Sequence, residues 1–401
     1  MNVEVFKKSS AGRLIATKFR DQSGHAFVPN PLPPKIEFDS ELVNCLSRAD
    51  QALGELRGLG MNLPNPELFV FPFMRREAVM SSRIEGTLTN ELELARYEAA
   101  AGESSARKID NPDAQEVANY VRAMQHGLAL LAKIPVCLNS ICELHGHLMA
   151  GVRGMEKRPG EFRKDQNLIG KDGDTMSSGR FVPPPVAAMR VALDAFEKYI
   201  HKKDALPPLV KLALIHYQFE AIHPFEDGNG RVGRMLITLL LAEWGLLPHP
   251  LLYLSAYFEA HRQAYYDRLL AVSEVGAWKE WVCFFLEGIA MQSEAAVAGA
   301  KQLLELHARW KKLLASGGSA NELRLAEWLF KSPTVSVQKV ADKLDLSYPG
   351  AKRIVGKFVE LGILSHADNF QYGKGYTATE IFDCIRATLE GHGVNKNESR
   401  V

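Results

Sequence analysis

The spacing of apolar residues along the chain predicts a protein built mainly from helices. In residues 37–60 and again in 66–85, apolar positions recur every three or four residues, which is the period of one helical face. The same spacing predicts further helices at 113–133, 137–151, 186–202, 207–222, 230–245, 259–273 and 277–315. The sequence therefore predicts an all-α core.

Three segments lack this period. Residues 1–35 end in a proline cluster and are expected to form an irregular arm, because proline-rich segments tend to lie over another surface. The small and polar residues 99–112 predict an exposed loop, and those at 316–321 predict a linker. Together they suggest the division 1–112 (arm and helical region), 113–315 (core) and 321–390 (C-terminal domain).

A fourth non-helical segment lies inside the core, at 167–185. Short apolar stretches at 168–170 and 181–182 flank a tip rich in lysine, aspartate and glycine. Two such stretches around a turn predict a β-hairpin.

The pattern changes again after the linker, from 321 to about 389. One short helix is expected from Val335 through Leu344 and a second at 351–361, with a turn between them. The stretch 363–376 then predicts a two-stranded wing. This order is typical of a winged helix-turn-helix domain.

Three basic residues lie on the second of these helices. Lys352, Arg353 and Lys357 are candidates for contact with DNA phosphates. The alternative is a solvated face on a module that binds proteins, because winged helices serve both purposes.

Composition narrows the class of protein. The chain has 401 residues, of which 46% are hydrophobic and 24% charged, which is ordinary for a globular protein of two or three domains. A net charge of +1 gives no general basis for binding nucleic acid or membranes. Charges interrupt every apolar run, so no membrane span is expected. The N-terminus lacks a secretory core, and five scattered cysteines suit a reducing compartment, so we expect a cytoplasmic protein.

The candidate chemistry is concentrated in one stretch, His223-Pro-Phe-Glu-Asp-Gly-Asn-Gly-Arg-Val-Gly-Arg234. Its glycine-rich turn leads directly into an apolar helix. The backbone N–H groups of Gly228, Asn229 and Gly230 would then gather at a helix N-terminus, which favours a phosphate. Arg231 and Arg234 are three residues apart, so they share a helical face and can bind further phosphates.

This stretch resembles the signature loop of the Fic family, His-Pro-Phe-x-Asp/Glu-Gly-Asn-Gly-Arg-x-x-Arg, at every defining position. The resemblance implies transfer of AMP from ATP to a Ser, Thr or Tyr hydroxyl on a protein. Glycine at position 230 favours this reaction over the kinase-like Doc branch, which carries lysine there. A different transferred group, such as phosphocholine or uridylate, is an alternative.

Individual roles follow from the chemistry together with the resemblance. His223 is the expected general base, because an imidazole titrates near neutral pH. Asp227 is the expected ligand of Mg²⁺, which prefers carboxylate and phosphate oxygens. Asn229 and the nearby N–H groups would hold the α-phosphate, Arg231 the leaving pyrophosphate and Arg234 the γ-phosphate. Phe225 is expected to anchor the loop, and Glu226 has no assigned role.

Two further segments resemble parts of the same family. Gly160-Glu-Phe-Arg163, with 167–170 and 181–185, is similar to the Fic flap, which pairs with the target backbone by strand addition. Leu168, Ile169 and Gly170 would also wall the nucleotide. The stretch that contains Tyr265 and Tyr266 is similar to the helix lining the adenine, although paired tyrosines in helices usually belong to a core.

An inhibitory motif is indicated upstream. Ser81-Ser-Arg-Ile-Glu85-Gly86 resembles the family pattern Ser/Thr-x-x-x-Glu-Gly/Asn. Ser81 and Glu85 share a helical face, and Gly86 suits a left-handed helix end. The resemblance implies that Glu85 pairs with Arg234 and occupies the place of the γ-phosphate.

Other functions remain open at this point. The same site could remove AMP from a target, or the Fic core could serve as the nucleotide sensor of a winged-helix transcription regulator. The resemblance implies a protein substrate, of which the chain itself is one candidate, and it also allows a homodimer.

Overall fold

The computed structural model describes residues 1–19, 22–63, 65–100, 111–153, 156–171, 173–315, 319–367 and 375–390. Contacts divide the chain into two compact units, each assembled from separate segments. The first unit comprises Met1–Gly54, Arg122–Leu246 and Leu254–Ala290, and the second comprises Glu55–Val121, Leu247–Tyr253 and Met291–Val401.

Helices dominate both units, as the apolar period predicts. They include α2 (Ser40–Met61), α3 (Glu67–Ile84), α5 (Pro112–Leu130), α6 (Leu138–Leu148), α7 (Val186–His201), α8 (Pro208–Ile222), α9 (Asn229–Glu243) and α12 (Trp278–Ala315). The helix expected at 259–273 is divided at His261 into α10 (Ser255–Ala260) and α11 (Arg262–Val275). An additional helix, α4 (Glu91–Ala100), precedes the expected loop, most of which lies outside the described residues.

The prediction of an irregular N-terminal arm is wrong. A short helix α1 (Val3–Phe6) leads into an antiparallel pair, β1 (Gly12–Phe19) and β2 (Gln22–Pro29). The strands form because β2 buries its end, Ala26 to Val28, against α7 and α8. The Phe27 N–H also donates to the Val182 carbonyl at 2.8 Å, which joins the strand to the end of the expected hairpin.

The expected hairpin at 167–185 is less regular than the sequence suggests. In its described part, 167–171 and 173–185, β pairing is limited to one bridge between Ile169 and Phe181, with N–H to O distances of 2.9 and 3.1 Å. The Asp174 carboxylate holds the tip by accepting from the Lys171 N–H at 2.6 Å and the Ser178 hydroxyl at 2.8 Å. Bonds to the Asp174 side chain thus take the place of a strand ladder.

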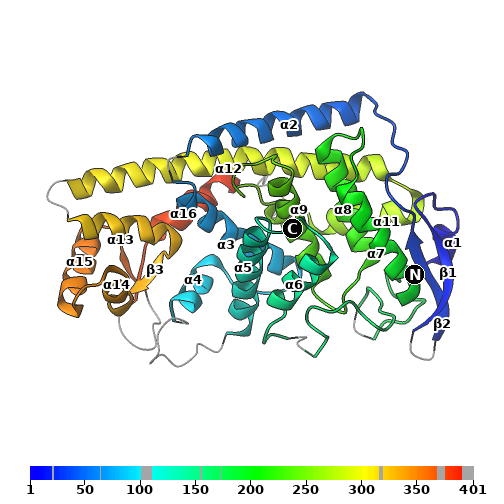
Figure 1. Cartoon of the computed structure of the whole chain (residues 1–401), viewed down its shortest axis with the longest axis horizontal. Helices are drawn as coiled ribbons and strands as arrows, with labels where there is room; N and C mark the ends of the chain where they lie inside the picture. Colours follow the sequence, from blue (N-terminus) through cyan, green and yellow to red (C-terminus); the bar gives the residue numbers. More distant parts are fainter. Residues whose placement is uncertain are drawn as a thin grey trace, which may run out of the picture. The chain divides into compact units, whose positions relative to one another are not determined.

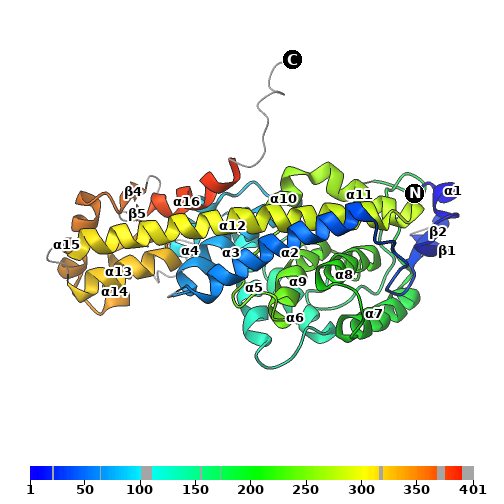
Figure 2. The same ribbon diagram turned by 90° about the horizontal axis from the view of Figure 1, so that it is seen from above.

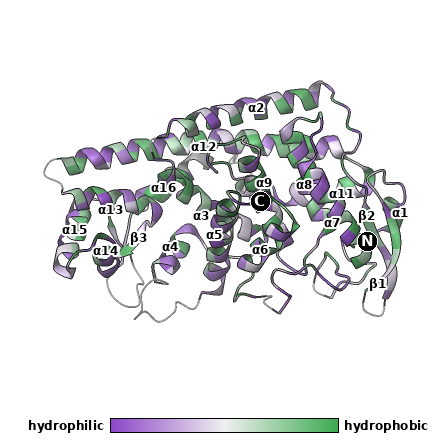
Figure 3. Ribbon diagram, in the orientation of Figure 1, coloured by the Kyte–Doolittle hydropathy of each residue, from purple (hydrophilic) through white to green (hydrophobic). Residues whose placement is uncertain are grey.

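Helices α8 and α9 form the centre of the first unit and lie side by side (Figures 1 and 2). Close approach requires Gly233, since a Cβ there would lie 3.1 Å from Phe219 Cδ1. The ribbon of α9 is largely hydrophobic after its first turn (Figure 3), and Met235 to Leu241 are buried. The core therefore fixes the C-terminal end of α8 and the N-terminal end of α9, where the candidate chemistry lies.

The second unit contains the C-terminal module, residues 320–390. Its elements are α13 (Ala320–Lys331), β3 (Thr334–Ser336), α14 (Val337–Leu344), α15 (Tyr348–Glu360), β4 (Ser365–Ala367), β5 (Gly375–Thr377) and α16 (Thr379–Glu390). The strands form an antiparallel sheet in the order β3-β5-β4. The helix expected from Val335 begins at Val337, because Ser336 caps it by accepting from the Lys339 N–H at 3.2 Å. The expected wing tip at 368–374 lies outside the described residues.

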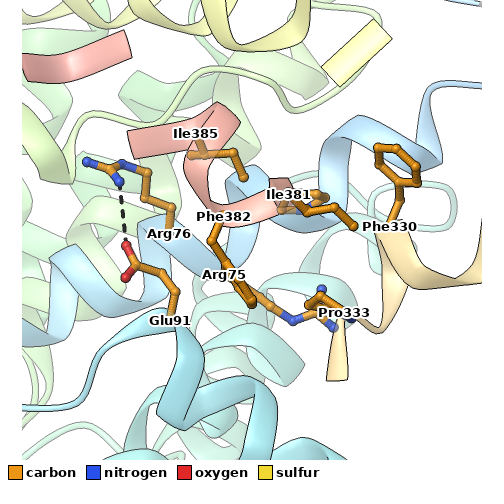
Figure 4. Close-up of a pocket in the computed structure, with 9 residues that line it drawn as sticks. Arg75, Arg76, Glu91, Phe330, Pro333, Ile381, Phe382 and Ile385 are labelled. Atoms are coloured by element: carbon orange, nitrogen blue, oxygen red, sulfur yellow. Dashed lines mark hydrogen bonds and ion pairs between the residues drawn. The ribbon is translucent and has the colours of Figure 1, made fainter. Parts of the chain in front are cut away.

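Helix α3 packs against this module. The buried Arg75 bonds Glu98 at 2.7 Å and the Lys331 carbonyl at 2.6 Å, and Arg76 lies 3.5 Å from Glu91. A small cavity of about 10 Å³ lies beside Arg75, Arg76 and Glu91, and Figure 4 shows residues that line it. It is lined by Pro72, Arg75, Arg76, Glu91, Phe330, Pro333, Ile381, Phe382 and Ile385.

One helix in the described part of the chain, α12, is long and apolar enough to cross a bilayer. In its most apolar stretch, 72% of the residues are buried inside the protein. Burial to this extent is typical of a core helix.

Candidate active site

His223 occupies the C-cap of α8 in a left-handed conformation, with φ 50° and ψ 63°. Its N–H donates to the Phe219 carbonyl at 3.0 Å, which ends the helix. A non-glycine residue in this region is strained by about 1–2 kcal/mol, so surrounding contacts must hold it. The imidazole is half-buried at the start of the loop.

Arg163 supplies one of those contacts. Its backbone N–H donates to the Pro224 carbonyl and its Nε donates to the His223 carbonyl, both at 2.9 Å. Together with the bond from the His223 N–H to the Phe219 carbonyl, these bonds fix the backbone of His223 on both sides of its Cα.

The loop that follows is closed by Asn229. Its Oδ1 accepts from the Phe225 N–H at 2.8 Å, and its Nδ2 donates to the Phe225 carbonyl at 2.9 Å. The same carbonyl accepts from Nδ2 of Asn167 at 3.2 Å. In this structure the Asn229 side chain thus shapes the loop, and the backbone N–H groups remain the candidates for phosphate contact.

Phe225 anchors the loop, and His145 of α6 is its partner. Phe225 is fully buried, and the two rings stack at 3.9 Å with an interplanar angle of 8°. Nδ1 of His145 accepts from the Gly160 N–H at 2.9 Å, so Nε2 carries the proton and donates to the Asp227 carbonyl at 3.1 Å. Burial lowers the pKa of His145 to about 4, so the imidazole is neutral.

Asp227 presents an ionised carboxylate. Burial by itself would raise its pKa, but Arg231, Lys157 and the Gly228 N–H together hold the pKa below its ordinary value. Lys157 Nζ lies 3.2 Å from Oδ2, and the Gly228 N–H donates to Oδ1 at 2.6 Å. The carboxylate is more than one-third exposed, so it can reach a ligand. One carboxylate combined with nucleotide phosphates suits Mg²⁺, and the described residues contain no preformed cluster of three acidic, His or Cys ligands.

Gly228 is the N-cap of α9, with φ 75°. A Cβ there would lie 3.1 Å from Met149 Sδ, so conformation and space both require glycine. The first turn of α9 follows directly and contains Gly230 and Arg231. Anions are stabilised at such a terminus by the unpaired N–H groups and the helix dipole.

The two arginines of α9 are both buried. Arg231 lies 3.7 Å from Met149 Sδ and 3.8 Å from Oδ1 of Asp227. Burial and then the charge of Arg234 lower the pKa of His216 to about 3. The positive charge of Arg234 thus helps to keep the buried His216 neutral.

Leu168, Ile169 and Gly170 lie on the flap, which we define as residues 166–183. Leu168 and Ile169 are half-buried and Gly170 is exposed. Arg180, on the other arm of the flap, stacks over the Tyr266 ring at 5.8 Å and pairs with Asp267 of α11. The flap is thus tied to the helix that was expected to line the adenine.

The two tyrosines of α11 have different environments. Tyr265 is buried, its hydroxyl lies 2.9 Å from His216 Nε2, and its ring stacks on Phe258 at 4.5 Å. Tyr266 is half-buried. Tyr265 is therefore a core residue, and Tyr266 is the one with a partly accessible ring.

The predicted inhibitory motif belongs to the second unit, at the end of α3. Ser81 is fully buried, Glu85 is the C-cap, and Gly86 has φ 101°, which confirms the expected left-handed helix end. The Thr87 N–H donates to the Ser82 carbonyl at 3.1 Å and closes this turn.

Several residues of the site were not assigned a role from the sequence. Arg163 lies in a quoted motif, but its partners are backbone carbonyls, which leave no mark in a sequence. His145 lies in an amphipathic helix that also contains His147, and neither histidine stands out from the helical pattern. Lys157 and Arg180 lie in irregular segments, where periodicity carries no information.

Comparison with known proteins identifies two adjoining domains. A Fic/DOC family N-terminal domain matches residues 43–129, and a Fic/DOC family domain matches residues 135–241. The protein adenylyltransferase Fic of Aedes aegypti is 32% identical over 141 residues, which cover 35% of this chain and 25% of that protein. The protein of the same name from Drosophila melanogaster is 33% identical over 122 residues, 30% of this chain and 23% of that protein. The match therefore spans about a quarter of these relatives.

A solved structure of a Fic family protein has a similar fold. The crystal structure of a Fic family protein from Desulfovibrio desulfuricans G20 covers 86% of this chain and 98% of its own, with a TM-score of 0.55 and 19% identity. At this identity the similarity concerns the fold. The two domain matches lead to one conclusion: the chain contains an N-terminal domain and a Fic domain of the Fic/DOC family, and the loop from His223 to Arg234 lies in the second of them.

Proposed function

We propose that this chain transfers AMP from ATP to a hydroxyl group of a protein. The observation that carries the proposal is the geometry of one loop. It begins with a histidine in a left-handed conformation at the end of α8 and ends at Gly228, the N-cap of α9. A proton acceptor and an anion-binding helix terminus are thus five residues apart on a rigid backbone.

The proposed reaction is a single displacement at phosphorus. The oxygen of the target hydroxyl bonds to the α-phosphorus, and the bond from that phosphorus to the bridging oxygen breaks. Pyrophosphate leaves with the electron pair, and the hydroxyl proton moves to a ring nitrogen of His223. Removal of this proton makes the hydroxyl a competent nucleophile.

The charged residues of the loop would hold the nucleotide. The backbone N–H groups of Asn229 and Gly230 bind the α-phosphate, where charge develops during transfer, and that of Gly228 would join them on release from Asp227 Oδ1. Arg231 binds the leaving pyrophosphate and Arg234 the γ-phosphate. Asp227 is the protein ligand for Mg²⁺, which neutralises phosphate charge when bound. The low pKa of Asp227 supports this role, because the carboxylate is ionised at neutral pH.

The target protein would dock along the flap. Val182 already accepts from the Phe27 N–H of β2, and Ile169 and Phe181 bond each other. In an extended segment successive residues direct their N–H and C=O groups to opposite sides, so the residues on either side of the Ile169 bridge would offer theirs to a target segment. We therefore propose 168–170 as the edge that pairs with an extended target segment by strand addition.

Glu85 is the proposed inhibitor of this reaction. Its carboxylate would bind the Arg234 guanidinium and exclude the γ-phosphate, leaving ATP in a posture unsuited to in-line attack. Support comes from α3, whose end carries Glu85 four residues after the fully buried Ser81. A side chain at the end of an anchored helix can hold a defined position.

The C-terminal module is proposed to be a winged helix. Its recognition helix would be α15, on which Lys352 and Arg353 are exposed, while Lys357 bonds Glu322 at 2.7 Å inside the module. If the module binds DNA, replacing Lys352 and Arg353 by alanine should make the slope of log affinity against log salt concentration shallower. The change should correspond to the loss of about two phosphate contacts.

The transfer is tested by incubating three proteins with ATP and Mg²⁺, followed by measurement of intact mass: the wild type, Glu85→Gly, and the double variant that combines Glu85→Gly with His223→Ala. The Glu85→Gly variant should gain one AMP, and the wild type should gain much less. His223→Ala introduced into the Glu85→Gly background should gain none. Absence of AMP from every variant and from added protein targets would contradict the proposed function.

A further inference from the structure

Arg163 is a fully buried arginine whose charge is not matched by a carboxylate among the residues that the structure describes. It lies just before the flap, in the sequence Gly160-Glu-Phe-Arg163. Within the described ranges its guanidinium donates to three backbone carbonyls: Nε to His223 at 2.9 Å, NH1 to Asp165 at 3.0 Å and NH2 to Pro184 at 2.5 Å.

Its position explains why such a charge is tolerated. Helix α8 ends at Ile222, where carbonyls are left unpaired and the dipole is negative. The Arg163 side chain bonds the C-cap carbonyl, and its own N–H bonds the next one, that of Pro224. Burial lowers the pKa of Arg163 to about 10, so the guanidinium is still charged at neutral pH.

The three carbonyls belong to different parts of the proposed active site. Asp165 and Pro184 are the residues immediately before and after the flap, and His223 carries the proposed general base. Gln166 adds a parallel link across the base of the flap, from its Nε2 to the Pro183 carbonyl at 2.8 Å. One guanidinium therefore joins both ends of the flap to each other and to the backbone of His223.

We propose that Arg163 is a positioning residue that sets the flap and the general base in one fixed relation. The inference rests on the proposed AMP transfer. The target hydroxyl would be delivered by the flap, and its proton would be removed by His223. Because the Arg163 side chain is fully buried against protein carbonyls, it would act on the reaction through the geometry of these two parts.

The shape of the guanidinium matters for this role. Its planar fork directs donors toward three carbonyls at once, whereas the lysine ammonium is a compact charge on a flexible stem. Arg163→Lys should therefore keep the charge and the fold but lose part of the alignment. Arg163→Ala should lose both the charge and the alignment.

Kinetics in the Glu85→Gly background give the first test. For Arg163→Ala, kcat should fall on the order of 100-fold, the effect expected when reacting groups are displaced by about 1 Å. The Kd for ATP should change by less than about threefold, because the residues that hold phosphate are retained. Arg163→Lys should be intermediate, and millimolar guanidinium should restore part of the Arg163→Ala activity. Lys164→Ala, which removes the neighbouring exposed cation bonded to Glu161, is the matched control and should resemble the parent.

Hydrogen exchange gives the second test and needs no activity. In Arg163→Ala or Arg163→Lys, amide exchange should rise together in 166–183 and in 223–228, and Lys164→Ala should leave both unchanged. Unchanged exchange, or a rise confined to one segment, would overturn the inference, as would a kcat equal to that of the parent. An inactive Glu85→Gly parent would instead contradict the proposed function, while the exchange result would still decide the role of Arg163.

Discussion

Nε2 of His145 lies 3.1 Å from the carbonyl oxygen of Asp227, and Nδ1 of the same ring accepts from the Gly160 N–H. A neutral, buried imidazole with one fixed tautomer thus joins α6, the turn before the flap and the candidate active-site loop. The loop depends on this ring staying uncharged, because a protonated Nδ1 could no longer accept the Gly160 N–H.

Stability should therefore fall in mild acid. The pKa values of His145 and His216 in the folded protein are about 4 and about 3, below the ordinary value of 6.5. Below pH 6.5 the unfolded chain binds more protons, so the free energy of unfolding decreases as pH falls toward these values. Between pH 7 and pH 5 each histidine should contribute a loss of roughly 2 kcal/mol, measurable by urea unfolding. His145→Gln, which does not titrate, should show a shallower decrease, and an equal decrease would contradict this account.

Replacing Gly228 by alanine should destabilise the protein by about 1–2 kcal/mol. The residue has φ 75°, and the new Cβ would meet Met149 Sδ at 3.1 Å. Gly356→Ala in α15 is the matched control: nothing lies within 4 Å of its Cβ, so this variant should gain about 0.5–1 kcal/mol. Thermal unfolding of both variants checks the pair, and a neutral Gly228→Ala would show that the loop does not need a left-handed cap.

Asp227→Asn should separate metal binding from stability. An amide oxygen can still accept the Gly228 N–H, so the free energy of unfolding should change by less than about 1 kcal/mol. The affinity for ATP should become much less dependent on Mg²⁺, because the amide is a weaker ligand than a carboxylate. Calorimetric titration with and without Mg²⁺ measures this, and an unaltered dependence would exclude Asp227 as the ligand.

Loosening α3 should weaken the proposed inhibition. Arg75 joins this helix to Glu98 and to the Lys331 carbonyl, so Arg75→Ala should reduce the free energy of unfolding by about 2 kcal/mol. Because Glu85 ends the same helix, AMP transfer by the variant should exceed that of the wild type. Arg324→Ala, which removes an exposed side chain bonded to Asn321, should change neither quantity. Reduced stability with unchanged transfer would mean that α3 does not need this anchor to inhibit.

Much of the helical framework can be predicted from the sequence, because one apolar face per helix leaves a clear period. Strands β1 and β2 cannot be predicted in the same way, because their apolar residues do not follow a clear period. The burial of β1 does not alternate strictly, and its partner buries only one end. Strand β3 has three residues, too few to establish any period before the helix that follows.

Within the site, the sequence indicates which residues have candidate roles more clearly than it indicates which groups those residues contact. The glycine turn and the positions of Arg231 and Arg234 at the start of α9 follow from spacing alone. The bonds from Asn229 to Phe225 do not, because a backbone partner carries no residue-specific signal. The separate environments of Tyr265 and Tyr266 depend on His216 and Arg180, which are distant in sequence.

The central claim is that the α-phosphate of ATP, with its adenosine, becomes attached to protein. The most direct measurement compares ATP labelled in the α-phosphate with ATP labelled in the γ-phosphate, using the Glu85→Gly variant. The account predicts that protein acquires the α label and that the γ label is released in pyrophosphate. Transfer of the γ label to protein would indicate a kinase and would contradict the account.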